Sequence, residues 1–439
     1  MHIYQRLCKI FTAAVVCGVA FAGHPAAAQT QIQPGQVIIS ELRLRGPAGA
    51  TDEFVELHNN TDQEIVVQAT DQTAGWSVVA YNGQFGAILY TVPNGTRIPA
   101  RGHFLGANSQ GYSLSGYPSG NPNEVIVITG TKTEPVGSNA ARSEAVTPNA
   151  VAASPFALTT PDATWTTDVP DGTGVALFST TNGTNMSAAT RLDAFGYANS
   201  PLLFREGTGF AKVVTDASEH TYYRDLRSGT PKDTNNNASD FILVGTAINL
   251  QITRLGAPGP QNLASPPINN TISHQLLDPA VGAAQPPNRE RRPNVEPNAD
   301  LGVLLFRRTF TNNTGSPVSR LRFRVIDLTV PGVPAGECGG GPCADVRALT
   351  SQDGEAGVGG QVVTVRGVTL EQPPSQPAGG GYNSSLSADF ITLETPLAPG
   401  ASVNIQFKLG IMRNGTYRFY LNIEAQNSPQ VDEPPPPAA

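Results

Sequence analysis

Charged residues are scarce in this sequence: Asp, Glu, Lys and Arg make up 14% of its 439 residues, against roughly 25% in an average soluble chain. It also has few runs with apolar residues at helical spacing, and few of the Ala, Glu, Lys and Leu tracts that fill helices. Turn-forming residues are abundant instead, with 45 glycines and 37 prolines. This composition favours many short strands joined by turns, so we expect an all-β protein.

Long hydrophobic runs are missing after the first apolar stretch of the sequence. No later segment has the roughly 18 apolar residues that a membrane-spanning helix needs. Residues 1–28 have the pattern of a secretory signal peptide. Arg6 and Lys9 precede an apolar stretch at 10–22, and three alanines ending at Ala28 form a small-residue cleavage site. We therefore expect cleavage near Ala28 and release into the periplasm or outside the cell.

Cysteine is also rare, and two of the four cysteines lie within the predicted signal peptide. The remaining pair, Cys338 and Cys343, predicts a disulfide across a small loop in an oxidising compartment. A structural metal site at these two thiols would need two further ligands, and no histidine lies near them in sequence. The formal net charge of −7 argues against general electrostatic binding to nucleic acid.

The first half of the chain alternates apolar and polar residues over short segments. In residues 37–44, Ile38 and Leu42 alternate with Glu41 and Arg43, as a strand with one buried and one exposed face requires. Similar segments separated by turn residues predict a β-sandwich. The predicted strands are residues 36–44, 53–59, 76–81, 87–92, 103–107, 125–129, 174–179, 191–197 and 218–224. Trp76 is predicted to lie in the core, with its indole N–H bonded to a backbone carbonyl.

Four motifs occur in order along this half: ISEL at 39–42, DEFVELHN at 52–59, GW at 75–76 and IPARGHFL at 98–105. Together they resemble a lamin-tail domain, and RLDAFGY at 191–197 is similar to the closing strand of that family. The resemblance implies an immunoglobulin-like sandwich over residues 36–250, of the kind found in secreted bacterial proteins. Residues 131–170, rich in Ala, Thr, Ser and Pro, are then expected to be a surface insertion.

The second half begins with residues 256–298, whose prolines and asparagines predict a linker with a strand near 272–277. Residues 299–428 are expected to form a second sandwich of unassigned role, and the proline-rich tail at 429–439 to be disordered. Its predicted strands are residues 301–310, 318–329, 361–370, 390–393, 401–409 and 415–424. The first two of these are predicted to pair as a hairpin around a turn at 312–315.

Motifs that would indicate catalysis are missing, and we predict no catalytic residue. Glu41, Glu53 and Glu56 fall on adjacent predicted strands, and paired carboxylates are what glycoside hydrolysis uses. The favoured interpretation is that Glu41 and Glu56 lie on strand faces beside Arg43 and His58 and form cross-strand charge pairs that stabilise the sheet.

One segment leaves a metal ion open, because its side-chain oxygens recur at alternate positions as in calcium loops. The residues concerned are Asp233, Asn235, Asn237 and Asp240. The segment has neither a glycine for the sharp turn nor a closing glutamate, so an asparagine-rich turn that caps itself is the preferred interpretation. Calcium is the one cofactor that the sequence leaves open.

The second half also carries an unusual run of arginines. Arg320, Arg322 and Arg324 alternate along one predicted strand and should project from the same face, with Arg307 and Arg308 on the hairpin partner. Such a basic stripe is suited to sulfate, uronate or phosphate groups, which guanidinium binds bidentately. Arginines paired with Asp or Glu on a solvated outer face are the alternative. The first interpretation implies an extracellular polysaccharide or another anionic polymer as partner.

The sequence therefore predicts a secreted, non-catalytic binding or structural protein, acting in adhesion, the extracellular matrix or cell-surface organisation. Because lamin-tail domains also accompany secreted enzymes, the resemblance leaves a second interpretation open. In that case the chain would be an accessory or targeting component of a hydrolase or nuclease system.

Overall fold

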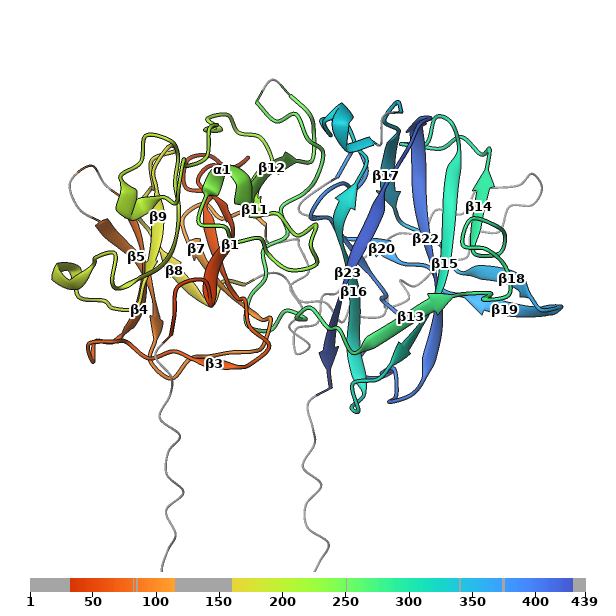
Figure 1. The fold of residues 1–439 in the computed structure, drawn as a ribbon, viewed down its shortest axis with the longest axis horizontal. Coiled ribbons are helices and arrows are strands. Elements are labelled where there is room, and N and C mark those ends of the chain that lie inside the picture. The colour runs from red at the N-terminus through yellow and green to blue at the C-terminus, as the bar shows by residue number, and fades with distance from the viewer. Residues whose placement is uncertain are drawn as a thin grey trace, which may run out of the picture. The chain divides into compact units, whose positions relative to one another are not determined.

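Strands dominate the structure, a computed structural model shown in Figure 1, and the predicted all-β class is confirmed. The structure describes residues 32–114 and 160–428, apart from 82, 84–85, 250, 339–340 and 373–375. The predicted signal peptide, the predicted strand at 125–129, residues 131–159 of the predicted insertion and the predicted tail at 429–439 lie outside the described residues. The helical elements described are single turns: η1 (Gly183–Asn185), η2 (Leu202–Phe204), α1 (Asn237–Asp240) and η3 (Ala335–Cys338).

The first sandwich packs a six-stranded sheet on a four-stranded one, in the orders β12-β11-β1-β2-β7-β8 and β10-β9-β4-β5. Their strands are β1 (Val37–Arg43), β2 (Phe54–Asn59), β4 (Gly75–Tyr81), β5 (Gly86–Pro93), β7 (His103–Asn108), β8 (Ala163–Trp165), β9 (Val175–Phe178), β10 (Arg191–Phe195), β11 (His220–Arg224) and β12 (Phe241–Gly245). A small pair joins β3 (Ile65–Val66) to β6 (Arg97–Ile98). Trp76 is buried in this core and donates its indole N–H to the Gln68 carbonyl at 2.9 Å, as predicted.

The second sandwich has one sheet in the order β13-β15-β22-β17, with β14 also paired to β15, and another in the order β20-β21-β16-β23. Their strands are β13 (Ile272–Leu276), β14 (Arg289–Arg292), β15 (Val303–Asn312), β16 (Val318–Leu328), β17 (Asp345–Leu349), β20 (Thr369–Leu370), β21 (Ser385–Ser387), β22 (Ser402–Arg413) and β23 (Phe419–Asn427). A separate hairpin joins β18 (Gly354–Val358) to β19 (Gln361–Val365).

The predicted hairpin of residues 301–310 and 318–329 is wrong, although both segments are strands. β15 pairs with β22, whereas β16 pairs with β23 in the opposite sheet. The short connection crosses from one sheet to the other, so that inner-face residues such as Phe310 and Phe323 pack together with ring centroids 4.8 Å apart. The predicted strand at 390–393 is not formed either, and β21 lies a few residues earlier.

The segment predicted as a linker, 256–298, contributes β13 and β14 and covers one face of the first sandwich. Residues 257–262 are buried, and the backbone N–H of Gly259 donates to Glu41 Oε1 at 2.9 Å. The side of β1 and β2 that the alternation predicts as exposed is therefore buried as well. Glu41 and Glu56, opposite one another in the sheet, are 3% and 2% exposed.

Charged side chains gather beneath this segment in a buried ionic network formed by Glu41, Arg322, Arg324, Asn383 and Glu424. Glu424 accepts from Arg322 Nε at 2.5 Å and from Arg324 Nε at 2.6 Å. The Asn383 side chain links Arg324, at 2.7 Å, to Glu41, at 3.0 Å. Burial opposes ionisation of Glu424, but Arg322 and Arg324 overcome this and lower its pKa to about 2. The network connects strands of both sandwiches, and the chain from Ile32 onward is one compact unit.

Replacing Glu424 with alanine should lower the free energy of unfolding by about 3–5 kcal/mol, because the buried guanidinium groups of Arg322 and Arg324 would both lose the carboxylate that accepts their Nε–H groups. Urea denaturation of the purified protein measures this change. Glu394→Ala is the matched control, since Glu394 is exposed and its loss should change stability by at most about 0.5 kcal/mol. Similar losses for the two variants would contradict this account of the network.

Candidate functional site

The arginines predicted to form a basic stripe are mostly buried. Arg320, Arg322 and Arg324 share one face of β16, but they are 3%, 0% and 3% exposed. Besides Glu424, the carboxylate of Glu371 lies 3.7 Å from Arg320 and 3.5 Å from Arg322. No exposed stripe forms at these positions. Pairing with glutamates agrees with the alternative interpretation, but the face that carries the pairs is internal rather than solvated.

The two remaining arginines of the predicted stripe lie in the other sheet, because β15 and β16 are not a hairpin. Arg307 is buried and bonds Gln406 at 2.7 Å and Glu290 at 2.9 Å. Its neighbour Arg308 points to the opposite side of β15, where it lines a cavity between the two sheets. The five arginines therefore do not converge on one surface.

A different set of arginines does converge, around a cavity of about 410 Å³ that we call the basic cavity. Arg289 and Arg291 alternate along β14 and so share a face, and Arg413 ends β22. β15 lies between these two strands. Leu304 on β15 also lines the basic cavity, and Tyr417 beyond β22 lines it too.

The three guanidinium groups of the basic cavity have neutral partners. Arg289 Nη1 donates to the Tyr417 hydroxyl at 3.0 Å, Arg291 Nη2 to Asn414 Oδ1 at 3.1 Å, and Arg413 Nε to the Cys343 carbonyl at 3.0 Å. Within the described part of the chain, none of the three takes part in an ion pair. The basic cavity therefore presents positive charge that the surrounding protein does not compensate.

Glu290 also lines the basic cavity, but other arginines engage its carboxylate. It accepts from Arg292 at 2.7 Å and from Arg307 at 2.9 Å. These hydrogen bonds lower the pKa of Glu290 and keep it ionised at neutral pH. Its carboxylate thus pairs with Arg292 and Arg307, and among the described residues it forms no ion pair with the three arginines of the cavity.

The loop that receives Arg413 is closed by a disulfide between Cys338 and Cys343, the pair that the sequence indicates. Cys343 forms a parallel bridge with Thr416, and the backbone N–H of Thr416 donates to the Pro342 carbonyl at 2.9 Å. The disulfide therefore holds the acceptor of Arg413 beside the end of β22.

Sequence reasoning missed the basic cavity because residues 289–292 lie in the segment predicted as a linker. The letters RERR at these positions already show the alternation of a strand with two arginines on one face. The sequence does not show that Arg413 lies near Arg289 and Arg291, because only the pairing of β14 with β15 and of β15 with β22 brings them together.

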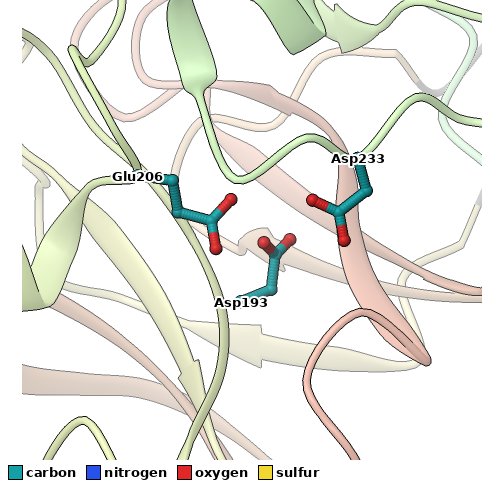
Figure 2. Close-up of side chains that lie close together, drawn as sticks. All are labelled: Asp193, Glu206 and Asp233. Carbon is teal, nitrogen blue, oxygen red and sulfur yellow. The ribbon is translucent and has the colours of Figure 1, made fainter.

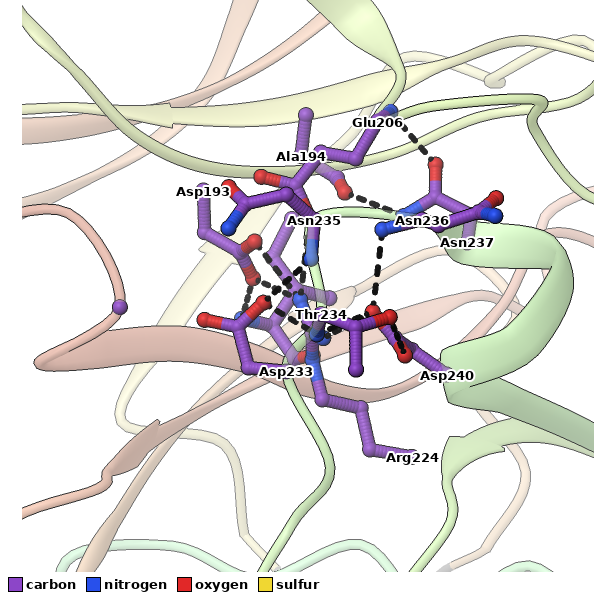
Figure 3. A network of polar contacts seen from close by, with 12 residues as sticks. Asp193, Ala194, Glu206, Arg224, Asp233, Thr234, Asn235, Asn236, Asn237 and Asp240 are labelled. Atoms are coloured by element: carbon purple, nitrogen blue, oxygen red, sulfur yellow. Dashed lines mark hydrogen bonds and ion pairs between the residues drawn. The ribbon is translucent and has the colours of Figure 1, made fainter.

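The asparagine-rich segment does not arrange its side chains as a calcium loop. The four candidate ligands were Asp233, Asn235, Asn237 and Asp240. Asn237 Oδ1 instead accepts from the backbone N–H groups of Gly196 and Glu206, at 3.0 and 2.9 Å. Asp240 accepts from both the backbone and the hydroxyl of Thr234, at 2.8 and 2.6 Å (Figure 3). These contacts are those of a turn that caps itself, the preferred interpretation from the sequence.

A cluster of acidic residues does form beside this turn, and Asp233 belongs to it. Figure 2 shows Asp193, Glu206 and Asp233 with their carboxylates turned toward one another, and one oxygen of each lies within 4.8 Å of the others. Arg224 on β11 lies in the same place, 2.7 Å from Asp193, 3.4 Å from Asp233 and 3.6 Å from Glu206. We call these four residues the acidic cluster.

The acidic cluster holds more negative charge than one guanidinium can balance. Burial first, and then the charge of Asp193, raises the pKa of Glu206 to about 9, so Glu206 carries a proton at neutral pH. Asp193, Glu206 and Asp233 are oxygen donors of the kind calcium takes. However, Arg224 already bonds both oxygens of Asp193 at 2.7 Å. The contacts present are those of a structural anchor between β10, β11 and the turn.

The comparisons with known proteins add no identity: no family model, no curated protein and no solved structure matches the chain. The lamin-tail resemblance therefore rests on the sequence motifs alone. In the part of the chain that the structure describes, no helix has the length and apolar character needed to cross a membrane.

Stability should fall as pH rises from 6 to 9, in part because of Glu206. In the folded protein Glu206 keeps its proton up to about pH 9, whereas its ordinary pKa is 4.5. The stabilising contribution is complete below the ordinary pKa and is lost as pH rises through the folded value. Glu206→Gln, which stays neutral, should therefore lose less thermal stability between pH 6 and 9 than the unmodified protein.

Glu355→Gln is the control for this pH series, since Glu355 is exposed on β18. Its melting temperature should follow that of the unmodified protein at each pH. If Glu206→Gln also followed the unmodified protein from pH 6 to 9, Glu206 would not be the protonated member of the acidic cluster.

Proposed function

We propose that this chain is a secreted, non-catalytic binding protein that holds an anionic polymer, such as an extracellular polysaccharide, at the basic cavity. The observation that carries the proposal is the convergence of Arg289, Arg291 and Arg413 on one cavity, with no ion pair to any of them among the described residues. Like charges held close together are unfavourable unless an anion lies between them. Guanidinium also binds carboxylate, sulfate and phosphate oxygens through two parallel hydrogen bonds.

The character of the ligand follows from the charge of the whole chain. With a formal net charge of −7, the protein repels polyanions in general and would attract them only where positive charge is concentrated. A polysaccharide with spaced sulfate or uronate groups suits such a local site better than a densely charged nucleic acid. Fewer of its charges would lie outside the cavity, where the acidic protein repels them. A site of this size on a sandwich fits the recognition of a short stretch of polymer.

Two further observations support a function outside the cytoplasm. The disulfide between Cys338 and Cys343 is typical of proteins in oxidising compartments. Residues 1–28 have the composition of a signal peptide. Residues 36–250 also resemble the lamin-tail domains of secreted bacterial proteins. The disulfide, the signal-peptide pattern and this resemblance together favour a role in adhesion, the extracellular matrix or cell-surface organisation.

Replacing Arg413 with alanine should weaken binding to a heparin oligosaccharide about tenfold, the equivalent of about 1.4 kcal/mol, as expected for loss of a charge-assisted hydrogen bond. Isothermal titration calorimetry at low salt measures the change. The affinity of the unmodified protein should fall as salt is added, because screening weakens contacts between exposed charges.

Arg97→Ala is the matched control, since it removes one positive charge from a side chain that is 68% exposed and paired with Glu64 in the first sandwich. Its heparin affinity should equal that of the unmodified protein. Equal losses for Arg413→Ala and Arg97→Ala, or no binding at low salt by the unmodified protein, would contradict a polymer site at the basic cavity.

A further inference from the structure

A second cavity of about 430 Å³ lies between the two sheets of the second sandwich. We call it the aromatic cleft, because most of its lining is aromatic. The residues that matter for its chemistry are Phe306, Arg308, Phe310, Phe407, Phe419 and Tyr420. Its volume lies in the range of about 300–1,000 Å³ that is usual for small-molecule sites.

The walls of the aromatic cleft are apolar and come from both sheets. Phe306 on β15 packs against Phe419 on β23 with ring centroids 5.8 Å apart, and Phe407 lies 6.1 Å from Phe419. Tyr420, at the start of β23, is 58% exposed and so forms part of the rim. Such walls would take up a flexible hydrocarbon chain by removing its surface from water.

Arg308 is the exception in this lining, because it occupies a core-facing position on β15. Leu304 and Phe310 on the same strand belong to the large core of the second sandwich, with Phe306 packed against it. Side chains two residues apart share a face of a strand. An arginine thus occupies the position between Phe306 and Phe310 on this face of β15, where a sandwich normally places another apolar side chain.

The charge of Arg308 has no anionic partner in the described residues. Its Nη1 donates to the main-chain carbonyls of Asn288 at 3.3 Å and Arg307 at 2.7 Å. None of the described residues that line the aromatic cleft is acidic. Arg308 is half-buried, and burial lowers its pKa. Withdrawing a charge from water without a partner is unfavourable, and an anion entering the cleft would remove this cost.

We propose that the aromatic cleft binds an amphipathic carboxylic acid, with the carboxylate on Arg308 and an aliphatic chain along Phe306, Phe310 and Phe419. One guanidinium group matches one carboxylate in the bidentate geometry that arginine favours. The cleft lies inside the sandwich, so the ligand is a free small molecule rather than a lipid within a bilayer. The inference does not rest on polymer binding, since Tyr417 is the one lining residue that the cleft shares with the basic cavity.

The test uses isothermal titration calorimetry of the purified protein with decanoate and with decanol, which differ in the charged group. Decanoate should bind at least tenfold more tightly than decanol. Octanoate, decanoate and dodecanoate should also form a series, with affinity rising about fourfold for each added CH₂ until the cleft is full. Decanol binding as tightly as decanoate, or no binding of either, would overturn the proposal.

Arg308→Met tests the role of the charge, since methionine keeps an unbranched side chain but cannot pair with a carboxylate. In this variant the affinities for decanoate and decanol should become about equal. Arg308→Lys should retain part of the preference for decanoate. Arg308→Met should also melt no lower than the unmodified protein, because it removes a half-buried charge. An unchanged preference for decanoate in Arg308→Met would overturn the assignment of the carboxylate.

Two further variants separate binding from folding. Arg366→Met is the matched control, because Arg366 lies beside an aromatic ring outside the cleft, with its guanidinium carbon 4.5 Å from the centroid of Phe390, and is paired with Asp353. It should leave the decanoate preference unchanged. Tyr420→Ser removes an exposed ring from the rim, so the fold should tolerate it. This variant should bind decanoate and decanol with equally reduced affinity. Unchanged affinity for both ligands would show that the aliphatic chain of the ligand does not lie in the aromatic cleft.

Discussion

The arrangement of this protein depends on charge buried where the two sandwiches meet. Glu424 accepts hydrogen bonds from Arg322 and Arg324. The Asn383 side chain accepts from Arg324 and donates to Glu41 in the first sandwich. Separating the sandwiches would break the hydrogen bond between Asn383 and Glu41 and would remove Glu41 from the charge of Arg324. With the hydrogen bonds that Glu41 and Glu56 accept from the backbone of Gly259 and Gln261, this contact joins the two sandwiches within a single compact unit.

The same constraint sorts the arginines of the second sandwich into two kinds. Those on β16 are buried beside Glu371 and Glu424 and are structural, although their spacing would suit an anion. Arg289, Arg291 and Arg413 have neutral partners, and Arg308 donates to main-chain carbonyls and to no carboxylate among the described residues. An anion can therefore bind where an arginine side chain is exposed and has no carboxylate partner among the described residues. The density of arginines in the sequence does not indicate such a place.

The sequence was sufficient for the fold class and for most strands, because alternation of apolar and polar residues is a local property. It placed Trp76 in the core and paired Cys338 with Cys343. It does not show which sheet a strand joins, and the hairpin that it predicts for β15 and β16 is therefore wrong. Nor could it show that residues 257–262 cover Glu41, because a face that looks amphipathic in sequence becomes internal when a distant segment packs on it.

NMR of the arginine Nε–H groups during titration with a heparin oligosaccharide distinguishes binding at the basic cavity from binding at the β16 face. We expect the Nε–H signals of Arg289, Arg291 and Arg413 to shift as ligand is added. The signals of Arg322 and Arg324 should not shift, because their Nε–H groups already donate to Glu424. Shifts confined to Arg322 and Arg324, or to arginines of the first sandwich, would contradict binding at the basic cavity.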